Sequence, residues 1–388
     1  MDNWPTIRPV WAEIDLDALT HNIREVRRIT SKTTKIMAVV KADAYGHGAI
    51  PTSKIFLNNG ADSLGVANLT EAIELRRAGI DSPILNLGYT PTESYGDLLA
   101  NRVTATIYDV GHAHALDLTS GKQGVRSIVH VKIDTGMNRL GFKPNAETIR
   151  AIKIISKMPN IELEGIFTHF AVSDTDKNYT RCQFKLFTWI LNELSKVGVE
   201  IPVKHVSNSA AIIDLPEYAL DMVRPGIMLY GYRPSSFANS VSVMLKPAMS
   251  LKTRLSNVKT VTQGVGISYG LTYTTHRPSI IGTLPIGYAD GYRRALSNKG
   301  WASINGKKAS VIGHVCMDQC MIDLTDHNDA ENGDEVILFG GGVAPSVEET
   351  AKLLDTIVHE VTCAISRRVP RVYLKKLKLV EVRDYLLA

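Results

Sequence analysis

Short apolar runs alternate with amphipathic stretches through about the first 240 residues of the chain. The eight runs lie at residues 36–40, 62–67, 83–87, 103–107, 127–133, 161–168, 203–206 and 221–223. Helix-length stretches separate most of them, and in these the apolar residues recur every three or four positions, as in 184–194. This alternation predicts the α/β class, with an N-terminal (β/α)8 TIM-like barrel over about residues 1–240. An open doubly wound sheet is the alternative, although no G-x-G-x-x-G motif follows a predicted strand.

The pattern changes after about residue 240. From 241 to 388 the chain is rich in Val, Ile and Thr, and turn sequences such as Asn305-Gly306 divide it into short strands. One helix is expected after Ser346, because Ser346 and Glu349 have the spacing of a capping box. The sequence therefore predicts a β-rich C-terminal domain, 241–388.

The length and composition indicate a soluble two-domain protein. A chain of 388 residues exceeds a single small core, and 44% hydrophobic with 21% charged residues is ordinary for a globular protein. The net charge of +5 is mild. The one basic cluster, in 373–378, alternates like the exposed face of a strand, so we expect no nucleic-acid binding.

Nothing in the sequence predicts a membrane span, a signal peptide, a disulfide scaffold or a metal site. No apolar stretch approaches the ~20 residues of a membrane helix, and no basic and apolar leader opens the chain. The four cysteines lack the paired spacing of a zinc site, and they are too few for a disulfide-stabilised fold. We therefore expect a cytoplasmic protein that binds no metal.

A lysine follows the first predicted barrel strand. Four apolar residues, 37–40, lead into Lys41, and a small-residue turn with Tyr45 follows. Partial burial would lower the pKa of this lysine and free its lone pair to form a Schiff base. The alternative is a strand-end lysine that points to solvent. Tyr45 and the glycines after it, which let backbone approach a ligand closely, favour a binding site.

Polar residues follow several other strands of the predicted barrel. They are His169, His205, Asn208, Ser209 and Arg224. Active sites of such barrels lie at the carboxyl ends of the strands, so their convergence there predicts a site. The helix start at Asn208 and Ser209, with Gly226 and Ile227 after the eighth strand, is suited to hold a phosphate, although Asn and Ser also serve as plain helix caps.

The sequence around Lys41, V-V-K-A-D-A-Y-G-H-G, resembles the pyridoxal phosphate lysine motif of the alanine racemases, which usually have Asn at the position of Asp43. Further segments at 131–141, 264–273, 313–319 and 367–371 resemble that family in the same order, so the match covers nearly the whole chain. The resemblance implies a racemase that interconverts L-alanine and D-alanine by two-base proton transfer at Cα. It also implies pyridoxal phosphate as the cofactor, a homodimer with shared active sites, and a supply of D-alanine for cell-wall peptidoglycan.

The resemblance also implies a role for each matching residue. The two catalytic bases would be Lys41 and Tyr269. The cofactor would be bound by Lys41, Tyr45, His169, Asn208, Ser209, Arg224, Gly226, Ile227 and His359. The substrate would be bound by Arg139, Met317, Asp318 and Tyr288. Lys132 matches a position that is carbamylated in the family, and Tyr269, Tyr288 and Met317 would enter the site of the partner subunit.

Two of these assignments also have a physical basis. An arginine keeps its proton at working pH, so Arg224 opposite the pyridine nitrogen would leave that nitrogen unprotonated and the ring a weak electron sink. Such a ring favours simple proton exchange at Cα. Lys132 beside Arg139 would be an unfavourable pair of like charges unless the lysine were modified.

Besides Asp43, two further positions depart from the family pattern. His359 stands where a tyrosine usually lines the pocket, so we expect L-serine to be accepted as well as alanine. His314 replaces a common arginine. The alternative functions are a broader alanine/serine racemase and a non-enzymatic pyridoxal phosphate carrier. Such carriers are single barrels, so the β-rich domain with Tyr269 argues against the second. A basic amino-acid decarboxylase would place an acid where Arg224 stands, and a metal hydrolase would need more His and Asp ligands.

Overall fold

The computed structural model describes residues 7–234, 243–327 and 329–387. The chain divides into two compact units. The barrel unit comprises Ala18–Ala44 and Ala49–Lys246, and the β-rich unit comprises Met1–Asp17, Tyr45–Gly48 and Pro247–Ala388. The predicted boundary at residue 240 lies outside the described residues.

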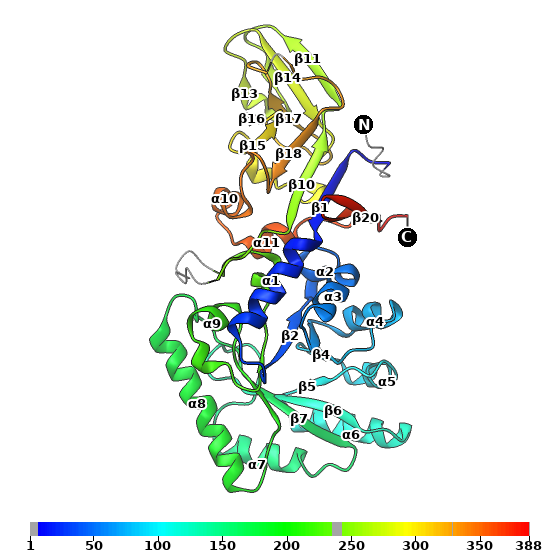
Figure 1. Ribbon diagram of the computed structural model, residues 1–388, viewed down its shortest axis with the longest axis vertical. Coiled ribbons are helices and arrows are strands. Elements are labelled where there is room, and N and C mark those ends of the chain that lie inside the picture. The colour runs from blue at the N-terminus through cyan, green and yellow to red at the C-terminus, as the bar shows by residue number, and fades with distance from the viewer. Residues whose placement is uncertain (1–6, 235–242, 328, 388) are drawn as a thin grey trace. The chain divides into compact units, whose positions relative to one another are not determined.

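Eight parallel strands form the centre of the barrel unit (Figure 1). They are β2 (Lys35–Val39), β3 (Ser63–Val66), β4 (Ile84–Asn86), β5 (Ala105–Ile107), β6 (Ser127–Lys132), β7 (Ile161–Phe167), β8 (Val203–His205) and β9 (Met222–Val223). Their order is β4-β3-β2-β9-β8-β7-β6-β5. A parallel bridge from Leu85 to Thr104 joins the two ends, with Asn86 N–H 3.0 Å from Thr104 O. This closure confirms the predicted barrel.

Helices precede or connect the barrel strands. They are α1 (Leu16–Ile29), α3 (Ala49–Asn58), α4 (Leu69–Arg77), α5 (Tyr95–Ala100), α6 (Val110–Gln123), α7 (Ala146–Ile155), α8 (Lys177–Lys196) and α9 (Ser209–Asp214). Apolar side chains that recur at helical spacing pack these helices against the strands. In α8, Phe187, Ile190 and Leu194 recur every three or four residues and lie in one buried cluster with Val131 and Ile166 of the strands.

A ten-stranded sheet forms the β-rich unit, in the order β11-β14-β17-β16-β15-β18-β10-β1-β19-β20. Its strands are β1 (Val10–Asp15), β10 (Met249–Arg254), β11 (Asn257–Val261), β14 (Ser279–Leu284), β15 (Trp301–Ile304), β16 (Lys307–Ile312), β17 (Cys320–Asp323), β18 (Glu335–Phe339), β19 (Arg371–Lys375) and β20 (Lys378–Arg383). The unit also contains α10 (Val347–Leu353), which begins with the predicted Ser346–Glu349 capping box, and α11 (Val358–Cys363).

The first strand belongs to this sheet and not to the barrel that was predicted to begin at residue 1. β1 pairs antiparallel with β10 and parallel with β19. Its residues Val10, Trp11, Ala12 and Ile14 are all buried. A central strand covered on both faces loses the alternation that would reveal its neighbours, so its partners could not be read from its own residues.

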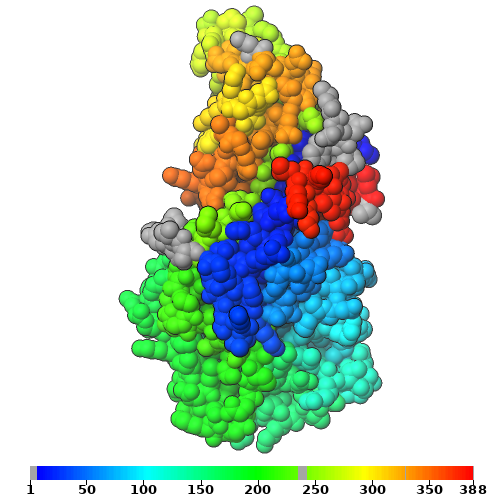
Figure 2. Space-filling view, in the orientation of Figure 1, coloured from blue at the N-terminus to red at the C-terminus, as the bar shows by residue number. Residues whose placement is uncertain are grey.

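The basic segment 373–378 is a hairpin and not one continuous strand. Lys376 and Leu377 have positive φ, 51° and 60°, so the chain turns between β19 and β20. This is the backbone of a tight primed turn, which usually contains Asn or Gly. Neither residue is present here, so the turn could not be predicted from the sequence. The side chains of β20 are largely exposed, in the red region of Figure 2.

The buried carboxylate of Asp290 joins separate segments of the β-rich unit by hydrogen bonds. Asp290 is fully buried and accepts hydrogen bonds from both terminal nitrogens of Arg8, at 2.5 and 2.7 Å, and from Gly287 N–H at 3.0 Å. Nε of Arg368 lies 3.6 Å from Oδ1 of Asp290. These bonds hold the turn that carries Tyr288, since Tyr288 opens the short helix η5 (Tyr288–Asp290).

None of the four cysteines, all of which lie among the described residues, forms a disulfide. Within the described part of the chain, no helix combines the length and the apolar character needed to cross a membrane.

Candidate active site

Lys41 begins a left-handed turn at the carboxyl end of β2. The turn, α2 (Lys41–Tyr45), has φ of 54°, 52° and 53° at Ala42, Asp43 and Ala44, so it is not a right-handed helix. Each residue in this conformation costs about 1–2 kcal/mol without compensation. A run of such residues therefore requires specific contacts to hold it.

Two carboxylates provide those contacts. Glu71 accepts hydrogen bonds from Ala42 N–H and Ala67 N–H, both at 2.7 Å. Asp43 accepts from Ala49 N–H at 2.7 Å, at the start of α3. Asp43 also suits the left-handed region better than most residues. These bonds fix the direction in which the chain leaves β2 and thereby the position of Lys41.

Positive charges gather around Lys132, at the end of β6. Lys132 is 5% exposed, and its Nζ lies 5.3 Å from the centroid of the Phe167 ring. Burial, followed by the charges of Arg139, Arg224 and Lys41, lowers the pKa of Lys132 to about 8. The structure thus brings four predicted site residues into one electrostatic cluster.

Arg224 follows β9 and is 3% exposed. Its Nη2 donates to the backbone oxygens of Thr168, at 2.8 Å, and Val206, at 3.0 Å. Nη2 also lies 3.4 Å from Nδ1 of His169. Burial lowers the pKa of Arg224 to about 9, which leaves it protonated at neutral pH. Burial and the charge of Arg224 lower the pKa of His169 well below its usual value, so that ring is neutral.

The other nitrogen of Arg224 begins a line of hydrogen bonds. Nη1 lies 2.7 Å from Nδ1 of His205, and Nε2 of His205 lies 2.8 Å from Nδ1 of His130. Nε2 of His130 lies 2.9 Å from Glu164 Oε2. Phe167 stacks on His205, with ring centroids 4.7 Å apart.

The loops after β8 and β9 meet at Ser209. Its Oγ accepts from Gly226 N–H at 2.9 Å and from Met228 N–H at 3.4 Å, so its own O–H proton can be donated to a further group. Asn208 caps α9 by accepting from Ala211 N–H at 3.1 Å. Ile227 begins the short helix η3 (Ile227–Tyr230) directly after Gly226.

The remaining predicted residues lie in the β-rich unit. Tyr45 lies beside His359, with ring centroids 5.8 Å apart, and burial raises the pKa of Tyr45. Tyr269 lies in η4 (Tyr269–Leu271), between the short paired strands β12 (Gly266–Ile267) and β13 (Tyr273–Thr274), and is 76% exposed. Tyr288 and Met317 lie on adjacent backbone, since Tyr288 N–H donates to Cys316 O and Ala289 N–H to Met317 O, both at 3.0 Å.

Asp318 pairs with an arginine of its own chain. Arg368 Nη2 lies 2.8 Å from Asp318 Oδ1, with both side chains partly exposed. The Tyr269 loop is joined to the segment that contains Asp318, because Ser268 donates to His314 O at 2.7 Å. The structure thus brings Tyr269, Tyr288 and Met317 onto neighbouring loops of one unit.

The sequence matches two family descriptions in order. Residues 14–234 match "Alanine racemase, N-terminal domain", and residues 248–373 match "Alanine racemase, C-terminal domain". The chain belongs to the alanine racemase family. It is 49% identical to an alanine racemase of Clostridium tetani, over 98% of this chain and 99% of that protein.

Solved structures of alanine racemases share the whole fold. The enzyme of Clostridium difficile 630 is 46% identical, with a TM-score of 0.95 over 98% of this chain and all of that one. The alanine racemase of Bacillus anthracis with bound L-Ala-P is 36% identical, with a TM-score of 0.94 over 99% of this chain and all of that one. The similarity therefore covers both units.

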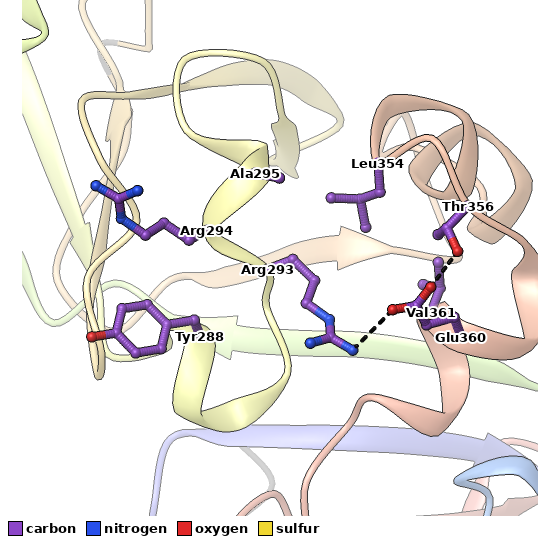
Figure 3. Close-up of a pocket in the computed structure, with 8 residues that line it drawn as sticks. All are labelled: Tyr288, Arg293, Arg294, Ala295, Leu354, Thr356, Glu360 and Val361. Carbon is purple, nitrogen blue, oxygen red and sulfur yellow. Dashed lines mark hydrogen bonds and ion pairs between the residues drawn. The ribbon is translucent and has the colours of Figure 1, made fainter.

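The β-rich unit of this alanine racemase family member contains a pocket of about 470 Å³ (Figure 3). It is lined by Tyr288, Arg293, Arg294, Ala295, Leu354, Thr356, Glu360 and Val361. Nη2 of Arg293 lies 3.4 Å from Oε1 of Glu360. The hydroxyl of Thr356 donates a hydrogen bond to the other carboxylate oxygen of Glu360. Among these residues the sequence predicted only Tyr288, because the others come from three separate segments that no local pattern connects.

His130 and Glu164 were not among the residues predicted from the sequence. Both lie within strands and not after them, so the pattern of polar residues at strand ends does not include them. The one available signal was the placement of a histidine and a glutamate inside otherwise apolar runs.

Proposed function

We propose that this chain interconverts L-alanine and D-alanine, with pyridoxal phosphate as its cofactor. The observation that carries the proposal is the buried guanidinium of Arg224, whose hydrogen-bond partners are carbonyl oxygens and neutral imidazoles. A permanent cation at this position would keep a pyridine nitrogen unprotonated. That environment suits proton exchange at Cα better than reactions that need a strong electron sink.

The donor groups in the barrel unit fit the cofactor. Ser209 has an O–H proton to donate, and it lies against the backbone of Gly226 at the loops where such barrels bind phosphate. We assign the phosphate to Ser209, Asn208, Gly226 and Ile227, with Tyr45 and His359 from the β-rich unit. Lys41, at the end of β2, would hold the aldehyde carbon covalently.

The proton transfers would be made by two side chains. When bound, pyridoxal phosphate would withdraw electrons from the amino acid and acidify its Cα–H. Lys41 Nζ would exchange the proton on one face of Cα, and Tyr269 Oη would exchange it on the other. We assign Arg139, Met317, Asp318 and Tyr288 to the substrate, with Arg139 toward its carboxylate, and His169 to the polar network beside Arg224.

A homodimer is part of the proposal. Tyr269, Tyr288 and Met317 are 76%, 41% and 53% exposed in the single chain, and large apolar side chains are costly to leave in water together. Their burial in the site of a partner subunit would remove that cost and supply the second base. Four cysteines without a disulfide suit a reducing cytoplasm, where D-alanine would be made for cell-wall peptidoglycan.

Carbamylation of Lys132 is also proposed. The charges of Arg139, Arg224 and Lys41 disfavour an ammonium group at this position. A carbamate would place a negative charge there and attract the guanidinium of Arg139 toward the substrate.

The test is α-proton exchange in deuterated buffer with added pyridoxal phosphate, beginning separately from L-alanine and D-alanine. Deuterium in the opposite enantiomer from either starting compound is expected. Tyr269→Phe should lose inversion, while Tyr273→Phe, which changes a tyrosine of the adjacent strand β13, serves as the control. Exchange with inversion undiminished in Tyr269→Phe would remove Tyr269 from its role, and no exchange with either enantiomer would reject alanine as the substrate.

A second candidate is a racemase of both alanine and serine. The imidazole of His359 lies against Tyr45 where the family usually has a larger phenol, which would leave room and a polar group for a hydroxymethyl side chain. Turnover of serine relative to alanine is expected to fall in His359→Tyr. An unchanged ratio would contradict this specificity.

A further inference from the structure

A single line of hydrogen bonds leads from Arg224 across the barrel unit to Glu164. It passes through His205 and His130 with donor–acceptor distances of 2.7, 2.8 and 2.9 Å. Arg224, His205 and His130 are 3%, 0% and 2% exposed, whereas the Glu164 side chain is 38% exposed. The line therefore joins a buried cation to a carboxylate that is partly in water.

The chemistry of the end groups assigns every proton in this line. A guanidinium only donates, so Nδ1 of His205 accepts from Arg224 and a neutral His205 has its proton on Nε2. That proton is donated to Nδ1 of His130, which leaves the His130 proton on Nε2 to be donated to Glu164. Burial and Arg224 lower the pKa of His205, so this ring is neutral. The hydrogen bond from His130 lowers the pKa of Glu164, so its carboxylate is ionised.

The line of hydrogen bonds connects the buried cation of Arg224 to a negative charge. No acidic side chain among the described residues forms an ion pair with Arg224, although buried cations are costly without an opposite charge. The imidazoles of His205 and His130 connect Arg224 to the carboxylate of Glu164, which supplies that opposite charge.

The backbone beside Glu164 is shaped for His130. A Cβ atom at Gly165 would lie 2.4–2.6 Å from three atoms of the His130 ring, so only glycine leaves room for it. The pairing of β6 with β7 also shifts register between Val129 and His130. Such irregularities redirect a side chain, and this one lies at His130.

We propose that Glu164 and His130 are positioning residues, which hold the Arg224 guanidinium toward the pyridine nitrogen of the cofactor through a neutral His205. The inference rests on the proposed function, because it requires pyridoxal phosphate opposite Arg224. In this arrangement Glu164 and His130 would contact neither cofactor nor substrate. They act by fixing the direction and the strength of one hydrogen bond of Arg224.

The test compares the dissociation constants of pyridoxal phosphate and of an analogue in which C–H replaces the ring nitrogen. The full-length chain, Glu164→Gln and Glu162→Gln are measured side by side. The amide introduced by Glu164→Gln would keep the shape and one acceptor oxygen but lose the charge, and Glu162 is an exposed residue of the same strand. The native chain should prefer pyridoxal phosphate, and Glu164→Gln should reduce this preference about 3- to 10-fold. Glu162→Gln should leave it unchanged.

The outcomes separate this inference from the proposed function. If Glu164 had only a structural role, Glu164→Gln would weaken the binding of both ligands equally and leave the ratio of their dissociation constants unchanged. That result would overturn this inference and leave the proposed function standing. A native chain that binds both ligands equally would overturn the placement of Arg224, and both proposals with it.

A second measurement needs no change at Glu164. Nitrogen-15 spectra of the histidine-labelled chain, assigned with His205→Gln and His130→Gln, should show both rings neutral and protonated at Nε2. A proton on Nδ1 of either ring would reverse the order of donors and overturn the inference.

Discussion

Replacement of Lys132 by methionine removes a buried positive charge while it keeps an unbranched side chain of similar length. Lys132 is 5% exposed, and three cations disfavour its ammonium form, whereas Asp134 is the one acid with an opposing effect among the causes of its pKa shift. We expect Lys132→Met to be more stable than the unmodified chain in buffer free of carbon dioxide. The size of the effect follows from the pKa.

The pKa of Lys132 falls from 10.5 to about 8 on folding. At 1.36 kcal/mol per pKa unit, this difference corresponds to about 3 kcal/mol against the charged form in the folded state. Below pH 8 both folded and unfolded chains carry the proton and the full penalty is present. Between pH 8 and 10.5 the folded chain loses its proton first, so the unfolding free energy rises by up to about 3 kcal/mol. Lys132→Met lacks this rise.

The same pKa makes the amine available to carbon dioxide. At pH 7.5 an amine with a pKa of about 8 is roughly one-quarter neutral, compared with about one in a thousand for a pKa of 10.5. Only the neutral amine forms a carbamate. Bicarbonate should therefore stabilise the native chain and have no effect on Lys132→Met.

The assay is thermal unfolding of the native chain, Lys132→Met and Lys157→Met at pH 7.5 and pH 10.5, with and without bicarbonate. Lys157 is exposed and serves as the control. At about 2–4 °C per kcal/mol for a unit of this size, Lys132→Met should unfold about 6–12 °C higher at pH 7.5 without bicarbonate. Labelled carbon dioxide should give a carbamate signal in carbon-13 spectra of the native chain only. A difference between the native chain and Lys132→Met that stays constant from pH 7.5 to 10.5 would refute the reasoning.

Three further predictions concern stability and can be checked by denaturant unfolding. Asp290→Ala should lower the unfolding free energy by about 2–3 kcal/mol, because it leaves its arginine partners unpaired, and unchanged stability would contradict this. Gly165→Ala should cost about 1–3 kcal/mol as its Cβ displaces the His130 ring, whereas Gly96→Ala, with no neighbour closer than 3.5 Å, should be neutral or stabilising. Ser346→Ala should cost about 0.5–2 kcal/mol through loss of the helix cap, and no loss would show that the cap contributes nothing.

Local periodicity predicted the elements of the barrel unit well. Each apolar run coincides with a strand, and β6 and β7 begin at the predicted residues 127 and 161. Side-chain spacing is a property of neighbours along the chain, so it can be read without tertiary information. The polar residues at strand ends were found for the same reason, because parallel strands of a closed barrel present their carboxyl ends together.

Contacts between distant segments could not be predicted in this way. The strand β1 lies between β10 and β19, and residues 45–48 belong to the β-rich unit although they begin only four positions after Lys41. The hairpin at Lys376 and Leu377 lacks the usual turn residues, so only the structure revealed it. Partner choice in a sheet depends on surfaces that are far apart in sequence.

Local patterns and motifs were enough to predict the barrel, the β-rich domain, the candidate lysine and the family resemblance, since each can be read from residues that are close along the chain. The left-handed turn held by Glu71 and Asp43, and the hydrogen-bonded line from Arg224 to Glu164, became visible only in three dimensions. Each depends on atoms within about 3 Å of one another from separate segments of the chain. Hydrogen bonds have that short range, and no spacing along a chain can predict them.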